Sequence, residues 1–157
     1  MTMKRILMIS MMMTLLTVSI SSAAEKDGPV KWLSYEAALN ESVKTGKPLL
    51  IHFTADWCSW CKRMKRDTYS HPDVARMMNE DFVPTMVDTD ANPQLKAEYG
   101  VEGLPTIWFM KGPGEGITYV PGYVDAPTFK NLLQWIATES YTEQSFDDFT
   151  KTPNDKG

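Results

Sequence analysis

The sequence has very few cysteines and histidines, the usual ligands of structural zinc sites and of covalently attached haem. Its 157 residues include two cysteines and two histidines. A structural zinc site needs four such ligands at close spacing, whereas His52 and His71 form no paired motif with Cys58 and Cys61. Covalent haem attachment needs a histidine directly after the second cysteine of a Cys-x-x-Cys pair, and Lys62 stands there. We therefore expect no metal site and no bound cofactor.

An excess of positive charge is also missing. The chain has 16 lysines and arginines against 20 aspartates and glutamates, a net charge of −4 with histidine neutral. Without Lys4 and Arg5, which belong to the N-terminal leader described next, the net charge is −6. Proteins that bind nucleic acid or anionic lipid through their overall field are basic. We expect neither as a partner.

The longest apolar run lies at the N-terminus. Lys4 and Arg5 precede the apolar stretch 6–20, and the small residues of 22–24 follow it. This order is typical of a secretory signal peptide. We predict that residues 1–24 are removed after Ala24 and that the mature protein is periplasmic or secreted, with no stable membrane insertion. An uncleaved anchor is the alternative, although the run is shorter than the roughly 20 residues of a spanning helix.

Hydrophobic periodicity divides the rest of the chain into alternating helices and strands. We expect a flexible segment at 25–31, one domain over 32–138, and a polar C-terminal tail at 139–157 that frays. The expected helices are 34–46, 61–66, 71–78, 92–99 and 129–136, and the expected strands are 49–53, 82–87, 106–110 and 117–120. Such βα alternation followed by a hairpin predicts an α/β fold with a central mixed sheet and helices on both faces.

The two cysteines form a Cys58-Ser59-Trp60-Cys61 motif directly after a predicted strand. A disulfide that closes so short a loop restrains the unfolded chain little, so a structural bridge explains the spacing poorly. Cys58 would lie at a helix N-terminus, where unpaired N–H groups favour the thiolate. We therefore expect Cys58 to be the accessible nucleophile and Cys61 to be the shielded cysteine that resolves a mixed disulfide.

The segment Phe53-Thr-Ala-Asp-Trp-Cys-Ser-Trp-Cys-Lys62 resembles the active-site stretch of thioredoxins, and Gly103-Leu-Pro-Thr106 resembles their cis-proline loop. The residues 87–90 and Gly122 match further landmarks of the family. Within the family, the runs 55–58 and 68–74 resemble the C-terminal domain of the thiol:disulfide interchange reductase DsbD and its free-standing periplasmic relatives. The resemblance implies the thioredoxin fold, protein disulfide substrates and a membrane thiol electron donor.

The resemblance also implies roles for individual residues. Pro105 and Leu104 would form the substrate-binding groove, and Trp57 and Trp60 would belong to the docking face. His52 takes the place of the buried acid of the family, so it either handles the proton of Cys61 or is a core residue with its nitrogens satisfied.

The sequence therefore predicts an exported thiol:disulfide oxidoreductase, and we expect a protein-disulfide reductase. The dipeptide between the cysteines tunes the redox potential in the family, and Ser59-Trp60 differs from the Gly-Pro of cytosolic thioredoxin. A disulfide isomerase or oxidase is therefore the first alternative. A thioredoxin-fold binding or chaperone module is the second.

Overall fold

Four strands form a single mixed sheet in the computed structural model, which describes residues 29–151. The strands are β1 (Leu49–Thr54), β2 (Val83–Asp88), β3 (Thr106–Gly112) and β4 (Glu115–Pro121), and their spatial order is β2-β1-β3-β4. β1 pairs parallel with β2 and antiparallel with β3, which pairs antiparallel with β4. The predicted signal peptide and its cleavage site lie outside the described residues.

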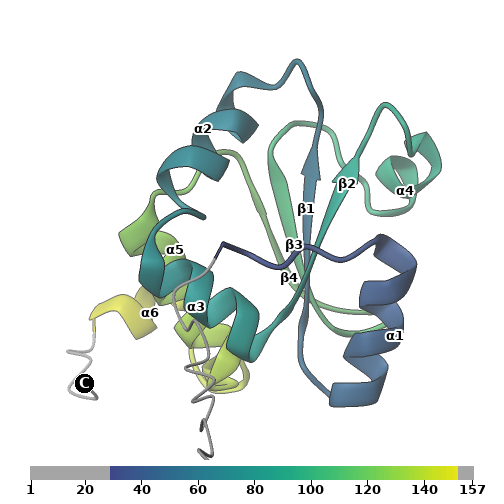
Figure 1. Ribbon diagram of the computed structural model, residues 1–157. Coiled ribbons are helices and arrows are strands. Elements are labelled where there is room, and N and C mark those ends of the chain that lie inside the picture. The colour runs from purple at the N-terminus through teal and green to yellow at the C-terminus, as the bar shows by residue number, and fades with distance from the viewer. Residues whose placement is uncertain (1–28, 152–157) are drawn as a thin grey trace, which may run out of the picture.

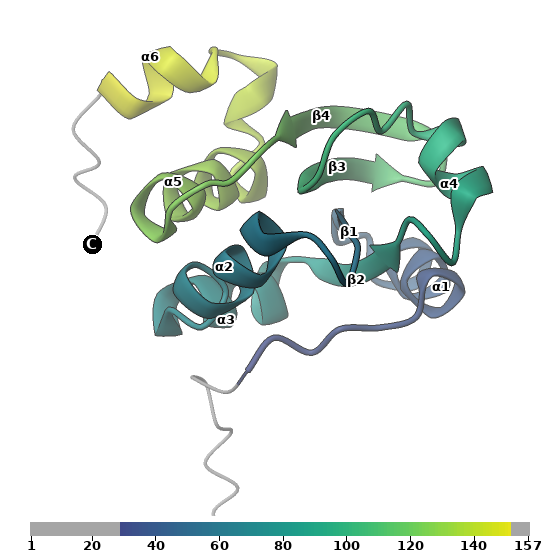
Figure 2. The same cartoon turned by 90° about the horizontal axis from the view of Figure 1, so that it is seen from above.

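Helices cover both faces of this sheet (Figure 1, Figure 2). One face carries α1 (Tyr35–Thr45) and α4 (Pro93–Glu98), and the other carries α2 (Ser59–Asp67), α3 (Pro72–Asp81) and α5 (Ala126–Ala137). This arrangement confirms the predicted thioredoxin fold. No helix within residues 29–151 is both long and apolar enough to cross a membrane.

The central strand β1 is buried along its whole length because both of its faces are covered. Successive side chains of a strand point to opposite faces. Leu49, Ile51 and Phe53 accordingly pack in the core on the α1 side, whereas Leu50 packs with the helices of the other face. His52 lies on the same face as Leu50.

Local sequence signals account for the helix boundaries. The Ser34 hydroxyl accepts a hydrogen bond from the Ala37 N–H at 3.3 Å, which caps the start of α1. Gly46 ends that helix in the left-handed conformation with φ of 71°. Pro72 is the first residue of α3, a position where its missing N–H costs nothing.

The prediction that the chain frays after Thr138 is wrong as far as Lys151. A short 3₁₀ turn at Ser140–Thr142 and helix α6 (Phe146–Lys151) pack back on α5. The Trp135 indole donates a hydrogen bond to the Gln144 carbonyl at 3.0 Å, and Phe149 is buried. This segment therefore covers Trp135, a large aromatic residue of α5.

The expected flexible segment 25–31 is held in place where the structure describes it, at residues 29–31. The Lys31 N–H donates to the Asn79 side-chain oxygen at 2.8 Å, and the Asn79 amide donates to the Pro29 carbonyl at 3.2 Å. The chain then crosses the outer edge of β2, where Leu33 forms an isolated bridge with Thr85.

Candidate active site

A disulfide joins Cys58 and Cys61 at the start of α2. Cys58 is the N-cap residue of the helix, and its Sγ accepts a hydrogen bond from the Cys61 N–H at 3.1 Å. The helix therefore directs an N–H group that has no partner within the helix, and the positive end of its dipole, at this sulfur. Both favour a thiolate at Cys58 after reduction.

Both cysteines are buried in the disulfide form, with 3 % of Cys58 and 1 % of Cys61 exposed. The predicted accessibility of Cys58 concerns the reduced protein and stays a prediction. The two residues pack with Ala55 and with Leu104 from the loop before β3. A substrate that reaches the disulfide must therefore contact this small apolar cluster.

The loop before β3 supplies the wall opposite α2. Its Leu104–Pro105 peptide bond is cis, as the resemblance predicted. The Pro105 carbonyl accepts a hydrogen bond from the Gly122 N–H at 2.7 Å, and Gly122 has a φ of 88° that favours glycine. Leu104 is half-buried, and its backbone N–H and C=O make no hydrogen bond within residues 29–151.

Trp57 precedes the disulfide and is 69 % exposed. Its indole N–H donates a hydrogen bond to the Asp90 carboxylate at 2.9 Å. Asp90 lies in the turn after β2, and β1 and β2 are parallel, so the loops after both strands meet at one edge of the sheet. Asp90 was not predicted as a partner of Trp57, although the parallel pairing of the two strands was a usable signal.

Trp60 lies between the cysteines and is 51 % exposed. Its ring centroid lies 5.6 Å from that of Tyr123, which follows β4. The Arg63 guanidinium lies 5.2 Å from the Trp60 centroid and 5.0 Å from the Tyr123 centroid, in the range of cation–π contacts. The sequence pattern gave no indication of this three-residue cluster, because Tyr123 comes from the far end of the domain.

The outer surface of α2 is positively charged. Asp67 accepts two hydrogen bonds from Arg66, at 2.7 and 3.0 Å, and one from Arg63 at 3.3 Å. The hydrogen bond from Arg66 is the main cause of the lowered pKa of Asp67. Lys62 and Lys65 add to the charge, so the helix that carries the dithiol has an excess of cations near it.

His52, on the central strand β1, is fully buried. Its Nδ1 lies 2.8 Å from the Tyr69 hydroxyl, and its Nε2 has no hydrogen-bond partner within residues 29–151. Burial, followed by the charge of Lys65, lowers the pKa of His52 to about 3. Burial also raises the pKa of Tyr69 well above its usual value. Both side chains are therefore neutral at physiological pH, and neither the sequence nor the resemblance pointed to Tyr69.

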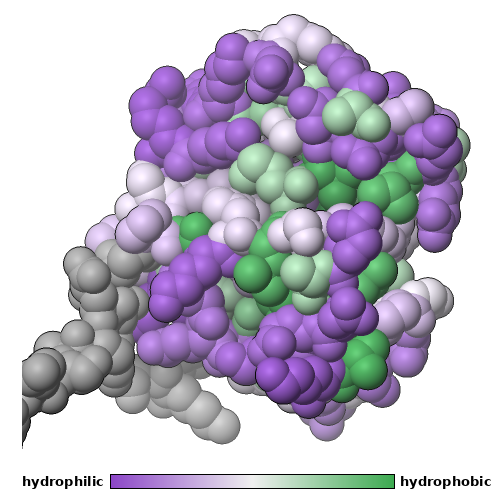
Figure 3. Space-filling view, turned by 45° about the vertical axis from the view of Figure 1, so that its right-hand side comes forward, coloured by the Kyte–Doolittle hydropathy of each residue, from purple (hydrophilic) through white to green (hydrophobic). Residues whose placement is uncertain are grey.

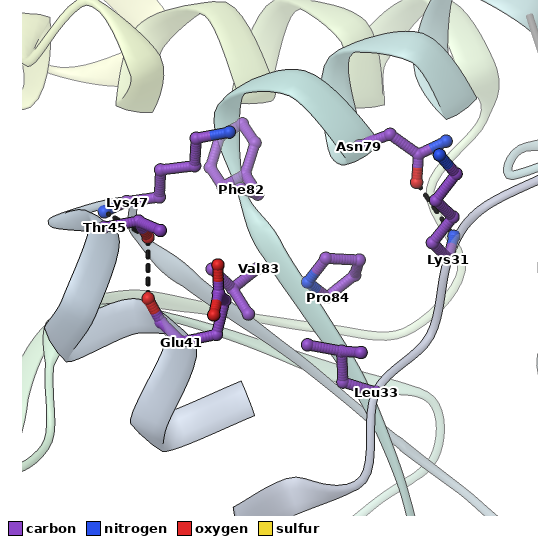
Figure 4. Close-up of a pocket in the computed structure, with 9 residues that line it drawn as sticks. All are labelled: Lys31, Leu33, Glu41, Thr45, Lys47, Asn79, Phe82, Val83 and Pro84. Carbon is purple, nitrogen blue, oxygen red and sulfur yellow. Dashed lines mark hydrogen bonds between the residues drawn. The ribbon is translucent and has the colours of Figure 1, made fainter. Parts of the chain in front are cut away.

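A pocket of about 320 Å³ lies at the other end of the sheet (Figure 4). Its floor includes Phe82, Val83 and Pro84 at the start of β2, whereas the disulfide follows the end of the parallel strand β1. Figure 3 brings the α1 side forward and shows hydrophobic residues gathered in the middle of that face within a hydrophilic frame. The pocket is separate from the dithiol. Within residues 29–151, no group of three or more His, Cys, Asp or Glu side chains is arranged to hold a metal ion.

Comparisons with known proteins agree with this geometry. The thioredoxin-like domain family model matches residues 35–137. The chain is 37 % identical over 105 residues to the thiol:disulfide interchange protein DsbD of Yersinia enterocolitica, a match that covers 63 % of this chain and 18 % of that protein. It is 32 % identical over 108 residues to DsbD of Photorhabdus laumondii, with 66 % and 18 % of the two chains covered.

Two solved structures extend the likeness to three dimensions. A thioredoxin from Thermus thermophilus has a TM-score of 0.65 at 25 % identity, with 71 % of this chain and 90 % of that chain covered. The reduced C-terminal domain of DsbD from Neisseria meningitidis has a TM-score of 0.55 at 26 % identity, with 63 % and 90 % covered. The chain matches less than a fifth of the length of the curated DsbD relatives.

Proposed function

Because this chain belongs to the thioredoxin-like domain family and carries the Cys58–Cys61 disulfide, we propose that it is an exported thiol:disulfide oxidoreductase that reduces protein disulfides. The observation that carries the proposal is the position of this disulfide. It lies at the N-terminus of α2 and packs against Leu104, next to cis-Pro105. The fold alone would not imply the activity.

The reaction has two steps. The Cys58 thiolate attacks one sulfur of a substrate disulfide, so a Cys58–substrate disulfide forms and the other substrate sulfur leaves as a thiolate. The Cys61 sulfur then attacks Cys58, so the intramolecular disulfide forms and the second substrate sulfur leaves. The dithiol loses two electrons and the substrate gains them. His52 assists the ionisation of Cys61 in the second step.

The substrate is a polypeptide that docks in extended form. The backbone N–H and C=O of Leu104 make no hydrogen bond within residues 29–151, so they can bind an extended strand, as in strand addition to a sheet edge. Trp57 and Trp60 flank the dithiol with large exposed rings, which are frequent anchors in protein interfaces. The DsbD relatives support a membrane thiol protein as the electron donor that regenerates the dithiol.

The equilibrium potential of the Cys58–Cys61 pair against glutathione tests the direction of electron flow. We expect a value between the thioredoxin value of about −270 mV and the isomerase value of about −180 mV, together with catalysis of insulin reduction by dithiothreitol. A potential near about −120 mV would make the protein an oxidant instead. A protein that leaves insulin untouched would be a binding module.

Export is tested on the protein made in its full length. Signal peptidase should remove residues 1–24, because the apolar run 6–20 ends in the small residues Ser22-Ala23-Ala24. The intact mass of the exported protein should then correspond to a chain that begins at Glu25. A mass that retains residues 1–24 would favour an uncleaved anchor.

A further inference from the structure

The Trp60 ring is exposed to solvent, yet it does not stand free. It contacts the Tyr123 ring, with the two centroids 5.6 Å apart, and the Arg63 guanidinium lies 5.2 Å from its centroid. Trp60 is also one residue from Cys61 and two from Cys58, so a polypeptide joined to Cys58 is brought next to it. Tryptophan is enriched among the residues that contribute most to binding in protein interfaces.

The cation of this cluster is held by an ion pair of its own. Arg63 follows Trp60 by three residues in α2, a spacing that places two side chains on the same face of a helix. Its Nε donates a hydrogen bond to the Asp67 carboxylate at 3.3 Å, and its guanidinium also lies 5.0 Å from the Tyr123 centroid. A planar guanidinium can stack on aromatic rings while it donates hydrogen bonds from its edge. Arg63 therefore contacts the carboxylate and both rings at once.

Tyr123 connects this cluster to the loop that carries the cis-proline. The residue before it, Gly122, donates its N–H to the Pro105 carbonyl at 2.7 Å. The residue after it, Val124, accepts a hydrogen bond at its carbonyl from the Thr68 hydroxyl at 2.6 Å, directly after α2. The backbone on either side of Tyr123 is thus tied to the proposed substrate groove and to the end of α2. The tryptophan ring and the groove therefore belong to one connected surface.

We propose that Arg63 and Tyr123 hold the Trp60 ring as a preorganised docking site for an apolar side chain of the substrate polypeptide, beside its reacting cysteine. Arg63 and Tyr123 are positioning residues that act through Trp60, and the three together favour protein disulfides over small disulfides. The inference rests on the proposed function and deepens it, because it concerns which disulfides the same site accepts.

Preorganisation is the physical reason for this preference. A side chain that becomes ordered only on binding loses rotamer freedom, and that loss is subtracted from the affinity. The contacts with Arg63 and Tyr123 restrict the Trp60 ring before the substrate arrives. A small disulfide has no side chain to place on the ring, so its reaction with Cys58 should not benefit from the cluster.

The positive charge of Arg63 has an effect of its own, which must be separated from the positioning of the ring. A cation near Cys58 favours the thiolate, and it would speed the attack on large and small disulfides alike. The ratio of the two rate constants therefore cancels this effect. Arg66 is the matched control, because it is exposed on α2 and hydrogen-bonds Asp67 as Arg63 does. Unlike Arg63, it makes no cation–π contact within residues 29–151.

The experiment compares a protein disulfide with a small one. The reduced protein is mixed with insulin or with bis(2-hydroxyethyl) disulfide, and the second-order rate constant for oxidation of the dithiol is measured for each. We expect Trp60→Ala to lower the ratio of the insulin constant to the small-disulfide constant about tenfold, as for an interface anchor. Arg63→Gln should lower the ratio about threefold, the size of an exposed cation–π contact, and Arg66→Gln should leave it unchanged.

Further variants test whether both positioning residues act through the ring. Tyr123→Phe keeps an aromatic ring and should retain most of the ratio, whereas Tyr123→Leu should lower it about threefold. In a Trp60→Ala background, Arg63→Gln should lower the ratio no further, because the residue through which it acts is gone. The unfolding midpoint of each variant shows that the compared proteins are folded.

The contrary outcomes are distinct. An equal loss of the ratio in Arg63→Gln and Arg66→Gln would mean that the charge of α2 attracts insulin, and would overturn the positioning role. A further loss by Arg63→Gln in the Trp60→Ala background would mean that Arg63 contacts the substrate itself. An unchanged ratio in Trp60→Ala would overturn the docking site. If the parent protein reacts with neither disulfide, the proposed function fails, whereas reaction with both at a ratio that every variant keeps would overturn this inference alone.

Discussion

Replacing Cys61 by serine should convert the protein from a catalyst into a trap. Cys58 keeps its place at the N-terminus of α2, where the N–H of residue 61 still points at its sulfur, because that contact comes from the backbone. The first attack should therefore proceed, and the mixed disulfide should persist because no second thiol can release it. Insulin reduction should fall to the rate of dithiothreitol alone, and non-reducing gels should show substrates joined to Cys58.

Cys58→Ser is the matched control for this experiment. It makes the same atomic change three residues away and removes the attacking sulfur instead of the resolving one. Catalysis should be lost equally, but no substrate should be captured. Capture by Cys58→Ser, or release from Cys61→Ser at the parental rate, would reverse the roles assigned to the two cysteines.

Replacing Phe129 by alanine should strongly lower the free energy of unfolding. Phe129 is fully buried in α5, and its ring centroid lies 5.5 Å from that of Tyr69 and 6.3 Å from that of Phe109. Removing a buried phenyl ring loses its transfer free energy and leaves a cavity, at a cost of about 3–5 kcal/mol. The denaturant midpoint should fall accordingly, with little change in the slope of the unfolding free energy against denaturant.

Val43→Ala is the control for that measurement. Val43 lies on α1 and is 68 % exposed, so its truncation should change the unfolding free energy by no more than about 0.5 kcal/mol. A loss below about 1 kcal/mol for Phe129→Ala would mean that α5 does not close the core as described. Both variants should be measured in the oxidised form, since the disulfide closes a loop at the start of α2.

The fold could be predicted from the sequence because its signals are local. The continuous apolar run of β1 reflects a strand buried on both faces, and Ser34 and Gly46 mark the ends of α1 through their own backbone chemistry. The segment after Thr138 was missed because its apolar residues are few and widely spaced. This segment is held in place by Trp135 of the preceding helix α5. Trp135 contacts Phe146 and donates a hydrogen bond to the Gln144 carbonyl, and such contacts are not visible in the hydrophobic pattern of the sequence.

The site could be predicted only in part, because only some of its signals are local in the sequence. The spacing of Cys58 and Cys61 and their place after a strand are visible in the sequence. Contacts between distant residues are not visible. Trp57 and Asp90 are 33 residues apart, and His52 and Tyr69 are 17 residues apart. No periodicity distinguishes Tyr69 from any other aromatic residue that follows a helix.

The contact of Leu33 with β2 has a consequence for how copies of the protein meet one another. β2 is an outer strand, and an uncovered outer strand offers its free N–H and C=O groups to any other extended chain. Here the Leu33 N–H bonds the Pro84 carbonyl at 3.0 Å, and the Leu33 carbonyl accepts from the Thr85 hydroxyl at 3.0 Å. Pro84 has no N–H to offer, so the start of this edge is already blunted. Protection against aggregation along this edge thus depends on a stretch of chain that belongs to no helix or sheet strand.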